Sequence, residues 1–180
     1  MHALLKKLSG GDRRSIGRSN EVVAHVLAHP AHFRHVFDGL ATDDPVVRMR
    51  AADAIEKITL RRPELLRPYK RQLLAIAGST NQQEIRWHTA LIMPRLQLTT
   101  KERAVALDIL LDYLRDKSSI VKAWAMQAIW DLAAADAKLK SQIIPLIEEL
   151  TQVGTAAMRA RGRKLLRQPK VASRRSQDIL

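Results

Sequence analysis

The sequence predicts an all-α fold, a right-handed α-α superhelix of about four helix pairs behind an N-terminal helical cap. The first observation behind this prediction is a nine-residue pattern that recurs along the chain. Its copies begin at Val47, Ile85, Val121 and Met158, which are 38, 36 and 37 residues apart. A period of this length is typical of helical repeats, in which each unit buries its apolar face only against its neighbours.

The pattern reads apolar, basic, any, any, small, any, any, apolar, apolar. A second observation is an apolar column with the same period, each member 37 residues from the last: Val36, Leu73, Leu110 and Ile147. We expect these four side chains to share one core. No segment shows the strict apolar–polar alternation of a β-strand.

Residues 1–29 are predicted to form a cap of two helices. The first covers residues 2–8 and ends at Ser9-Gly10-Gly11-Asp12, because paired glycines interrupt a helix. The second covers most of residues 12–28. Its apolar side comprises Val22, Val23 and Val26. Pro30 ends it and suits the first turn of the next helix.

Four helix pairs follow, in residues 30–59, 63–97, 99–135 and 138–168. The first helices are expected at about 30–41, 63–77, 100–116 and 138–151. The second helices are expected at about 44–58, 82–96, 118–134 and 155–167. Residues 1–168 thus form one domain, and residues 169–180 are predicted to be a flexible basic tail because they lack periodic apolar positions.

Helix start signals support these assignments. Asp44 is a candidate N-cap with Pro45 at the first helical position. The spacing of a capping box, in which a cap side chain and a glutamate three residues later satisfy each other's backbone, occurs twice. These pairs are Asn81 with Glu84 and Thr99 with Glu102, and further candidate caps are Ser118 and Asp136.

The copies of the pattern resemble HEAT repeats. Asp44-Pro45-Val46-Val47-Arg48 is the most similar, followed by Ile85-Arg86, Val121-Lys122 and Met158-Arg159. Lysine replaces arginine in the third copy, and Gly162 takes the small position in the fourth. The resemblance covers about residues 30–168. It implies that the second helices line a concave surface gripping protein or nucleic acid. It also implies that the basic residues of the pattern, Arg48, Arg86, Lys122 and Arg159, tie neighbouring repeats together.

Helical geometry indicates which side chains would form that surface. With the first apolar residue of each copy at position 0 and about 100° per residue, positions 2, 5, 6 and 9 point away from the core. The partner-binding residues predicted there are Met49, Trp87, Leu91, Met126 and Trp130. An exposed apolar patch containing tryptophan is typical of an interaction site. Aromatic residues equally serve core packing, which is the prediction for Trp124.

Basic charge gathers at the C-terminal end. The formal net charge is +13, and residues 155–180 hold eight basic residues against one aspartate. The polyanion-binding residues predicted there are Arg159, Arg163, Lys164 and Arg167. A basic end attracts nucleic acid, acidic protein or anionic membrane alike, and it also serves solubility alone.

The leading functional hypothesis is a non-catalytic scaffold that holds a partner protein, with the basic end selecting an acidic flank. The alternative is a nucleic-acid-binding protein that uses the same basic end with the tryptophans as stacking surfaces. Resemblance to HEAT-like DNA glycosylases makes an enzyme a distant third. A glycosylase needs a carboxylate positioned on the concave surface. The sequence offers no clear one there, because Glu84 is expected to cap a helix and Asp131 merely follows Trp130.

Composition narrows the remaining classes. The chain has no cysteine, hence no disulfide or thiolate metal site. Its first seven residues lack the long apolar core expected of a signal peptide, and no apolar run approaches the ~18 residues of a membrane span. We therefore expect a cytoplasmic monomer without cofactor.

The histidines His25, His29, His32 and His35 are clustered in sequence. Zinc needs three or four convergent ligands, whereas Pro30 separates these histidines into pairs and no acidic partner completes a site. The sequence therefore predicts a solvated, mildly pH-sensitive surface and no metal site. No Ser/His/Asp arrangement is present at recognisable spacing, so no catalytic residue is assigned.

Overall fold

The computed structural model describes residues 2–12 and 15–167, and within them all regular structure is helical. The α-helices are α1 (Ala3–Leu8), α2 (Ser19–Ala28), α3 (Phe33–Asp38), α4 (Pro45–Arg61), α5 (Lys70–Ser79), α6 (Gln83–Ile92), α7 (Thr100–Tyr113), α8 (Ser119–Leu132), α9 (Ala137–Val153) and α10 (Ala156–Leu166). Short 3-10 segments are η1 (Pro30–His32), η2 (Gly39–Ala41), η3 (Pro63–Tyr69) and η4 (Met93–Arg95). The predicted tail at 169–180 lies outside the described residues.

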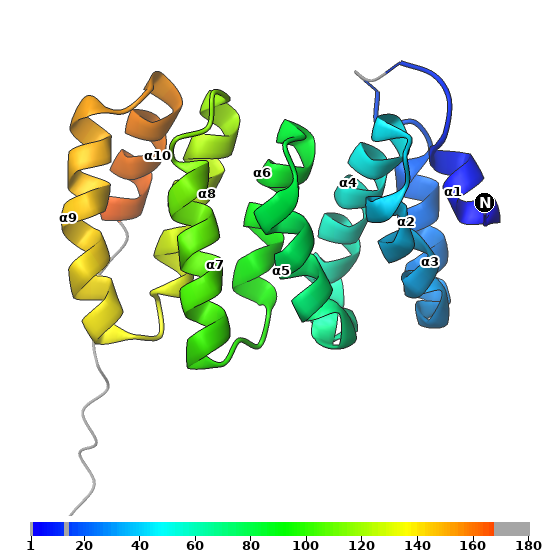
Figure 1. Cartoon of the computed structure of the whole chain (residues 1–180), viewed down its shortest axis with the longest axis horizontal. Coiled ribbons are helices and arrows are strands. Elements are labelled where there is room, and N and C mark those ends of the chain that lie inside the picture. The colour runs from blue at the N-terminus through cyan, green and yellow to red at the C-terminus, as the bar shows by residue number, and fades with distance from the viewer. Residues whose placement is uncertain (1, 13–14, 168–180) are drawn as a thin grey trace, which may run out of the picture.

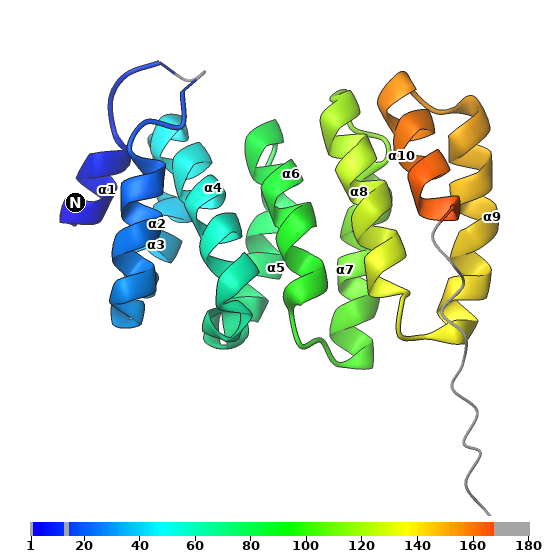
Figure 2. The same cartoon turned by 180° about the vertical axis from the view of Figure 1, so that it is seen from behind.

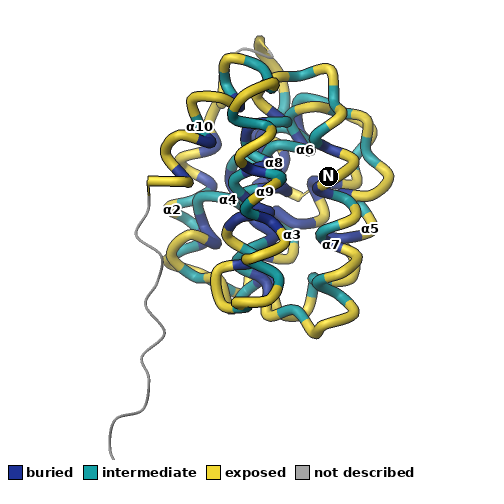
Figure 3. The backbone as a smooth tube through the Cα atoms, turned by 90° about the vertical axis from the view of Figure 1, so that its left-hand side faces the viewer, coloured by how far each residue is buried: buried dark blue, intermediate teal, exposed yellow. Residues whose placement is uncertain are grey.

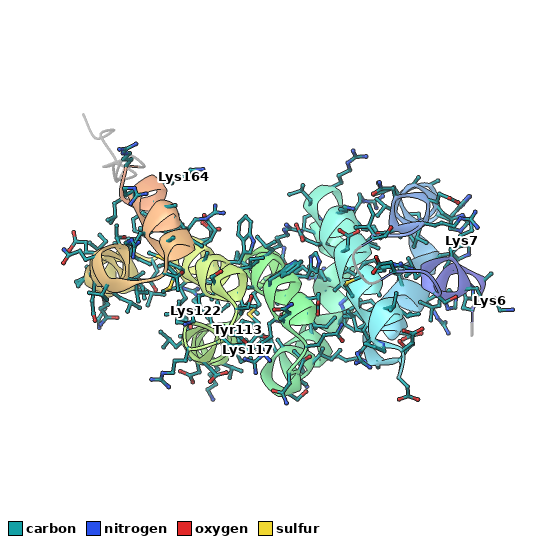
Figure 4. The ribbon with its side chains drawn as sticks, turned by 90° about the horizontal axis from the view of Figure 1, so that it is seen from above. Lys6, Lys7, Tyr113, Lys117, Lys122 and Lys164 are labelled. Carbon is teal, nitrogen blue, oxygen red and sulfur yellow. The ribbon has the colours of Figure 1, made fainter. Side chains whose placement is uncertain are left out.

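The helices stand side by side in two layers (Figures 1 and 2). One layer contains α3, α5, α7 and α9, and the other contains α2, α4, α6, α8 and α10, with α1 covering the N-terminal end. Each helix of the second layer packs against the next one along the row. Seen from above, the row curves, so that α2 and α10 stand forward of α6 and α8 on the second-layer side (Figure 4).

The core lies between the two layers (Figure 3). The predicted apolar column is confirmed as part of it, since its four residues, Val36, Leu73, Leu110 and Ile147, are fully buried in one cluster. Among the described residues, no helix is both long and apolar enough to cross a bilayer.

Most of the predicted helix starts are confirmed. The Asp44 carboxylate accepts the Val46 amide at 2.8 Å, and Thr99 and Glu102 form a complete capping box. Ser118 and Asp136 cap α8 and α9. The capping box predicted at Asn81 and Glu84 is wrong. Helix α6 has Gln82 at its N-cap, and the Gln82 side chain instead donates to the Pro45 carbonyl at 2.8 Å.

The predicted helix over residues 12–28 is too long, because α2 begins only at Ser19. Gly10, Gly11 and Gly17 have positive φ angles of 72°, 74° and 54°, which is the region that glycine tolerates best. The loop also has a long-range anchor. The Arg50 side chain on α4 donates hydrogen bonds to the carbonyl oxygens of Gly10, Asp12 and Ser15, and these bonds hold the segment in its non-helical path.

Candidate binding surface

The solvent side of α4, α6, α8 and α10, here called the second-helix face, is narrower than predicted. Pattern position 5 is buried in three of the four helices, at Ala52, Ala90 and Met126. Each of these helices has a neighbour on both sides within its layer as well as a first helix behind it. Such neighbours cover the flanks of each helix. Position 6 keeps some exposed surface in all four helices, and position 2 does so in all except α8, where Ala123 is buried.

The apolar part of the second-helix face is correspondingly small. Met126 is 0% exposed and Trp130 is 8% exposed, so the prediction that these two residues contact a partner is not met in this conformation. The Lys140 ammonium lies 2.9 Å from the Trp130 ring centre and further covers it. Met49, Trp87 and Leu91 are half-buried and keep some surface. Trp87 and Leu91, one helical turn apart on α6, form the apolar centre.

The carboxylates of α4 are already occupied. Asp53 accepts hydrogen bonds from Lys57 at 2.7 Å and from the Ser19 hydroxyl at 2.5 Å. Glu56 lies 2.6 Å from Nδ1 of His88 and 3.8 Å from Arg95. The negative charge of Asp53 and Glu56 on this part of the face is therefore largely neutralised by neighbouring side chains.

Helix α10 has the opposite character. Its predicted polyanion-binding residues, Arg159, Arg163, Lys164 and Arg167, are all exposed. Residues 155–167 contain no Asp or Glu, and none of the ion pairs between described residues involves this helix. Figure 4 shows Lys164 on the opposite side of the row from Lys117 and Lys122. The positive charge of α10 is available to an external anion.

Arg161 connects the basic end with the rest of the face, a link that sequence reasoning missed. Its guanidinium lies 4.0 Å from the ring centre of Trp124 and donates to Oε1 of Gln127 at 3.1 Å. Trp124 is half-buried and packs against the core, as predicted. Arg161 and Trp124 both stand at position 3 of their copies, which is the signal that could have paired them. The nearby Asp131 has a raised pKa because of its burial.

The repeated basic residues make contacts between units. Arg48 donates to Gln82 at 2.9 Å and to the Thr42 carbonyl at 2.7 Å. Arg86 donates to Asp116 at 2.7 Å and to the Thr80 carbonyl at 2.8 Å. Lys122 is half-buried on α8. Both arginines thus hold the turn before their own helix and reach the following repeat.

No group of three or more histidine, aspartate or glutamate side chains in the described part of the chain is arranged to hold a metal ion. Comparisons with protein-family models, with curated proteins and with solved structures found no match. The function proposed below therefore rests on the geometry of the chain itself.

Proposed function

We propose that this protein is a non-catalytic, HEAT-type solenoid scaffold that holds an acidic segment of a partner protein on its second-helix face. The solenoid part of the proposal is supported by contacts that recur with nearly constant offset. Arg48 with Gln82, Arg103 with Asp136 and Gln127 with Arg161 are separated by 34, 33 and 34 residues. A monomer in the cytoplasm remains the expected state.

The observation that carries the functional proposal is the contrast between α10 and the rest of the face. Acidic side chains on α4 are held by their own neighbours, whereas α10 presents basic side chains without an acidic one. In the proposed mechanism, Trp87 and Leu91 contact an apolar side chain of the partner. Arg163 and Lys164 then select its acidic flank. Charge of this kind contributes mainly specificity and association rate, and the apolar contact contributes affinity.

A photo-crosslinking amino acid placed at Leu91 tests this proposal, with placement at Leu111 as the matched control. Leu111 is 39% exposed on α7, in the other layer. We expect a discrete protein adduct from residue 91 in a nuclease-treated lysate and none from residue 111. Equal labelling from both positions would contradict the proposal.

Charge reversal supplies the second arm of this experiment. Arg163→Glu with Lys164→Glu should abolish the adduct, since the acidic flank would then be repelled. Arg115→Glu with Lys117→Glu, two exposed residues after α7, should leave it intact. Circular dichroism of each variant confirms that the helices persist. An adduct that survives charge reversal on α10 would show that the apolar contact at Leu91 forms without the basic side chains. It would contradict the role given to Arg163 and Lys164.

A second candidate, binding of single-stranded nucleic acid, is favoured by the Arg161–Trp124 contact beside the exposed charges of α10. Aromatic and guanidinium surfaces together accept an unstacked base while the basic side chains neutralise phosphates. Anisotropy of a labelled oligothymidylate, titrated at several salt concentrations, tests it. Neutralising Arg163, Lys164 and Arg167 should reduce the salt slope by about 2, since each lost phosphate contact removes about 0.7. Absence of binding at about 50 mM salt would exclude this candidate.

A further inference from the structure

Five of the six histidines of the chain gather at the N-terminal end of the row. This histidine cluster comprises His2, His25, His29, His32 and His35. His2 precedes α1 and His29 follows α2, whereas the other three lie on α2, η1 and α3. The distances between contacting ring centres run from 3.7 to 6.3 Å. Pro30 does not divide them, contrary to the sequence-based expectation, because η1 returns His32 to His25.

Two hydrogen bonds of the histidine cluster each need an unprotonated ring nitrogen as acceptor. Nδ1 of His2 accepts the Leu4 amide at 3.2 Å and so caps α1. Nε2 of His25 and Nδ1 of His32 are 2.8 Å apart, so one of them must be an acceptor. A protonated imidazole has two donors and no acceptor. The rings of His2 and His35 also stack in parallel, with centres 3.7 Å apart. Charging both rings of either pair therefore replaces an attraction by a repulsion.

The surroundings add to this effect. The charged groups around the cluster are Lys7 on α1, Glu21 on α2, and Arg34 and Asp38 on α3. Arg50 on α4 contacts the other end of α1, at the Leu8 carbonyl. Glu21 already pairs with Arg18 at 2.7 Å and with Lys7 at 3.6 Å. Partial burial first, then neighbouring histidines and Lys7 or Arg34, lower the pKa of His25 and of His35 below the ordinary 6.5. Asp38 acts weakly in the opposite direction on His35.

Helix α1 is held at its two ends by groups of different pH response. At its start the cap is His2, whose ring stacks on that of His35 on α3. At its end the Leu8 carbonyl accepts from Arg50 at 2.9 Å, and arginine keeps its charge throughout this range. Between the two ends, Leu4, Leu5 and Leu8 cover the terminal part of the core. Acid would loosen the first end while the second stays anchored.

We propose that the histidine cluster is a pH-sensitive latch that releases α1 from the end of the row in mild acid while the remaining helices stay packed. The sign follows from linkage. Because the closed form disfavours protonated rings, the open form takes up protons first as the pH falls. The latch is therefore fully closed above about pH 6.5 and opens progressively below it.

Hydrogen–deuterium exchange of the full chain, measured at about pH 7.5 and about pH 5 and corrected for the chemical exchange rate, tests the latch. We expect protection of the α1 amides to fall about fivefold or more, as repulsion between two charges about 4 Å apart in water implies. Protection in α8 should not change. Unchanged α1 protection at the lower pH, or an equal loss in α8, would overturn the proposal.

Two variants assign the effect to the cluster. His25→Gln combined with His35→Gln should keep α1 protected at the lower pH, because glutamine does not titrate. His88→Gln, at the one histidine outside the cluster, should respond to pH as the unaltered chain does. A fall in α1 protection that persists in the double variant overturns the latch. If that variant does not fold, a ring-proton titration of the unaltered chain decides, and pKa values of His25 and His35 at or above 6.5 count against it.

Discussion

Arg50 is a wholly buried cation on α4, with 2% of its surface exposed. It donates to the carbonyl oxygens of Leu8, Gly10, Asp12 and Ser15, at 2.9, 2.6, 2.9 and 2.9 Å. The planar guanidinium presents five donors in a fixed fork, which suits several converging carbonyls. One side chain thereby satisfies the backbone of a loop that has little regular structure of its own.

Replacing Arg50 by alanine should lower the free energy of unfolding by about 3 kcal/mol, since it leaves several carbonyls without a donor and opens a cavity. Arg50→Lys should also destabilise the protein, because a single ammonium cannot reach all four acceptors. The control is Arg61→Ala, an exposed position on the same helix, which should change stability by less than about 0.5 kcal/mol. Urea unfolding measures all three, and similar losses for Arg50→Ala and Arg61→Ala would refute the role given to Arg50.

Tyr113 is a buried phenol whose titration can be followed directly. Its hydroxyl donates to the Ala77 carbonyl at 2.7 Å and lies 3.3 Å from the Thr89 hydroxyl. Burial raises its pKa from 10.0 to about 12. The unfolded chain loses this proton first as the pH rises, so the contribution of Tyr113 to stability is present below pH 10 and is lost towards pH 12.

In a tyrosinate absorbance titration we therefore expect a late component with a midpoint at about 12. Tyr113→Phe should remove this component and cost about 1 kcal/mol through the lost hydrogen bond. Tyr69→Phe, at the only other tyrosine, should retain it. Loss of the late-titrating component in Tyr69→Phe instead would show that it belongs to Tyr69 and not to Tyr113.

Two helical glycines, Gly162 and Gly78, differ in how much space their surroundings leave for a side chain. A Cβ at Gly162 on α10 would approach the Cε of Met126 to 2.8 Å and would also collide with Thr151 on α9. A Cβ at Gly78 on α5 would meet Ile109 only at an ordinary contact distance of 3.7 Å. The first glycine is required by the close approach of three helices, and the second is not.

Gly162→Ala should therefore destabilise the protein by about 1 to 3 kcal/mol, since overpacking outweighs the better helix propensity of alanine. Gly78→Ala should stabilise it by up to about 1 kcal/mol through that same propensity. Thermal unfolding of both variants measures the contrast. Destabilisation by neither variant would mean that helix propensity alone explains the result. Destabilisation by both would contradict the free space assigned to Gly78.

Sequence reasoning predicted the local features of the elements and missed those that depend on distant residues. Asp44 and Thr99 cap their helices through residues two or three positions away, so local spacing was sufficient. The late start of α2, at Ser19, reflects contacts of the preceding segment with Arg50, which lies 35 residues beyond Ser15. The burial of Met126 and Trp130 depends on how many helices surround α8. A helical wheel drawn for one helix gives no information about these neighbours.

At the scale of the molecule, every helix makes its main packing contacts with its immediate neighbours in the row. Polar contacts follow the same rule. Ser19 with Asp53, Glu56 with His88 and Arg103 with Asp136 each join adjacent units. The described helices at the two ends of the row lie far apart (Figure 1), and we expect stability to be the sum of local units and their interfaces.

In this arrangement, Arg50→Ala and Gly162→Ala should each destabilise only the helices near the substituted residue. Arg50→Ala should raise hydrogen exchange in α1, α2 and α4 while α9 and α10 keep their protection. Gly162→Ala should do the reverse, raising exchange in α9 and α10 first, because in a repeat array an end can open without the rest. A single cooperative domain would instead lose protection in every helix in proportion to the lost stability. Exchange measured peptide by peptide on both variants separates these outcomes. A uniform loss along the chain would contradict the proposal that it is a solenoid.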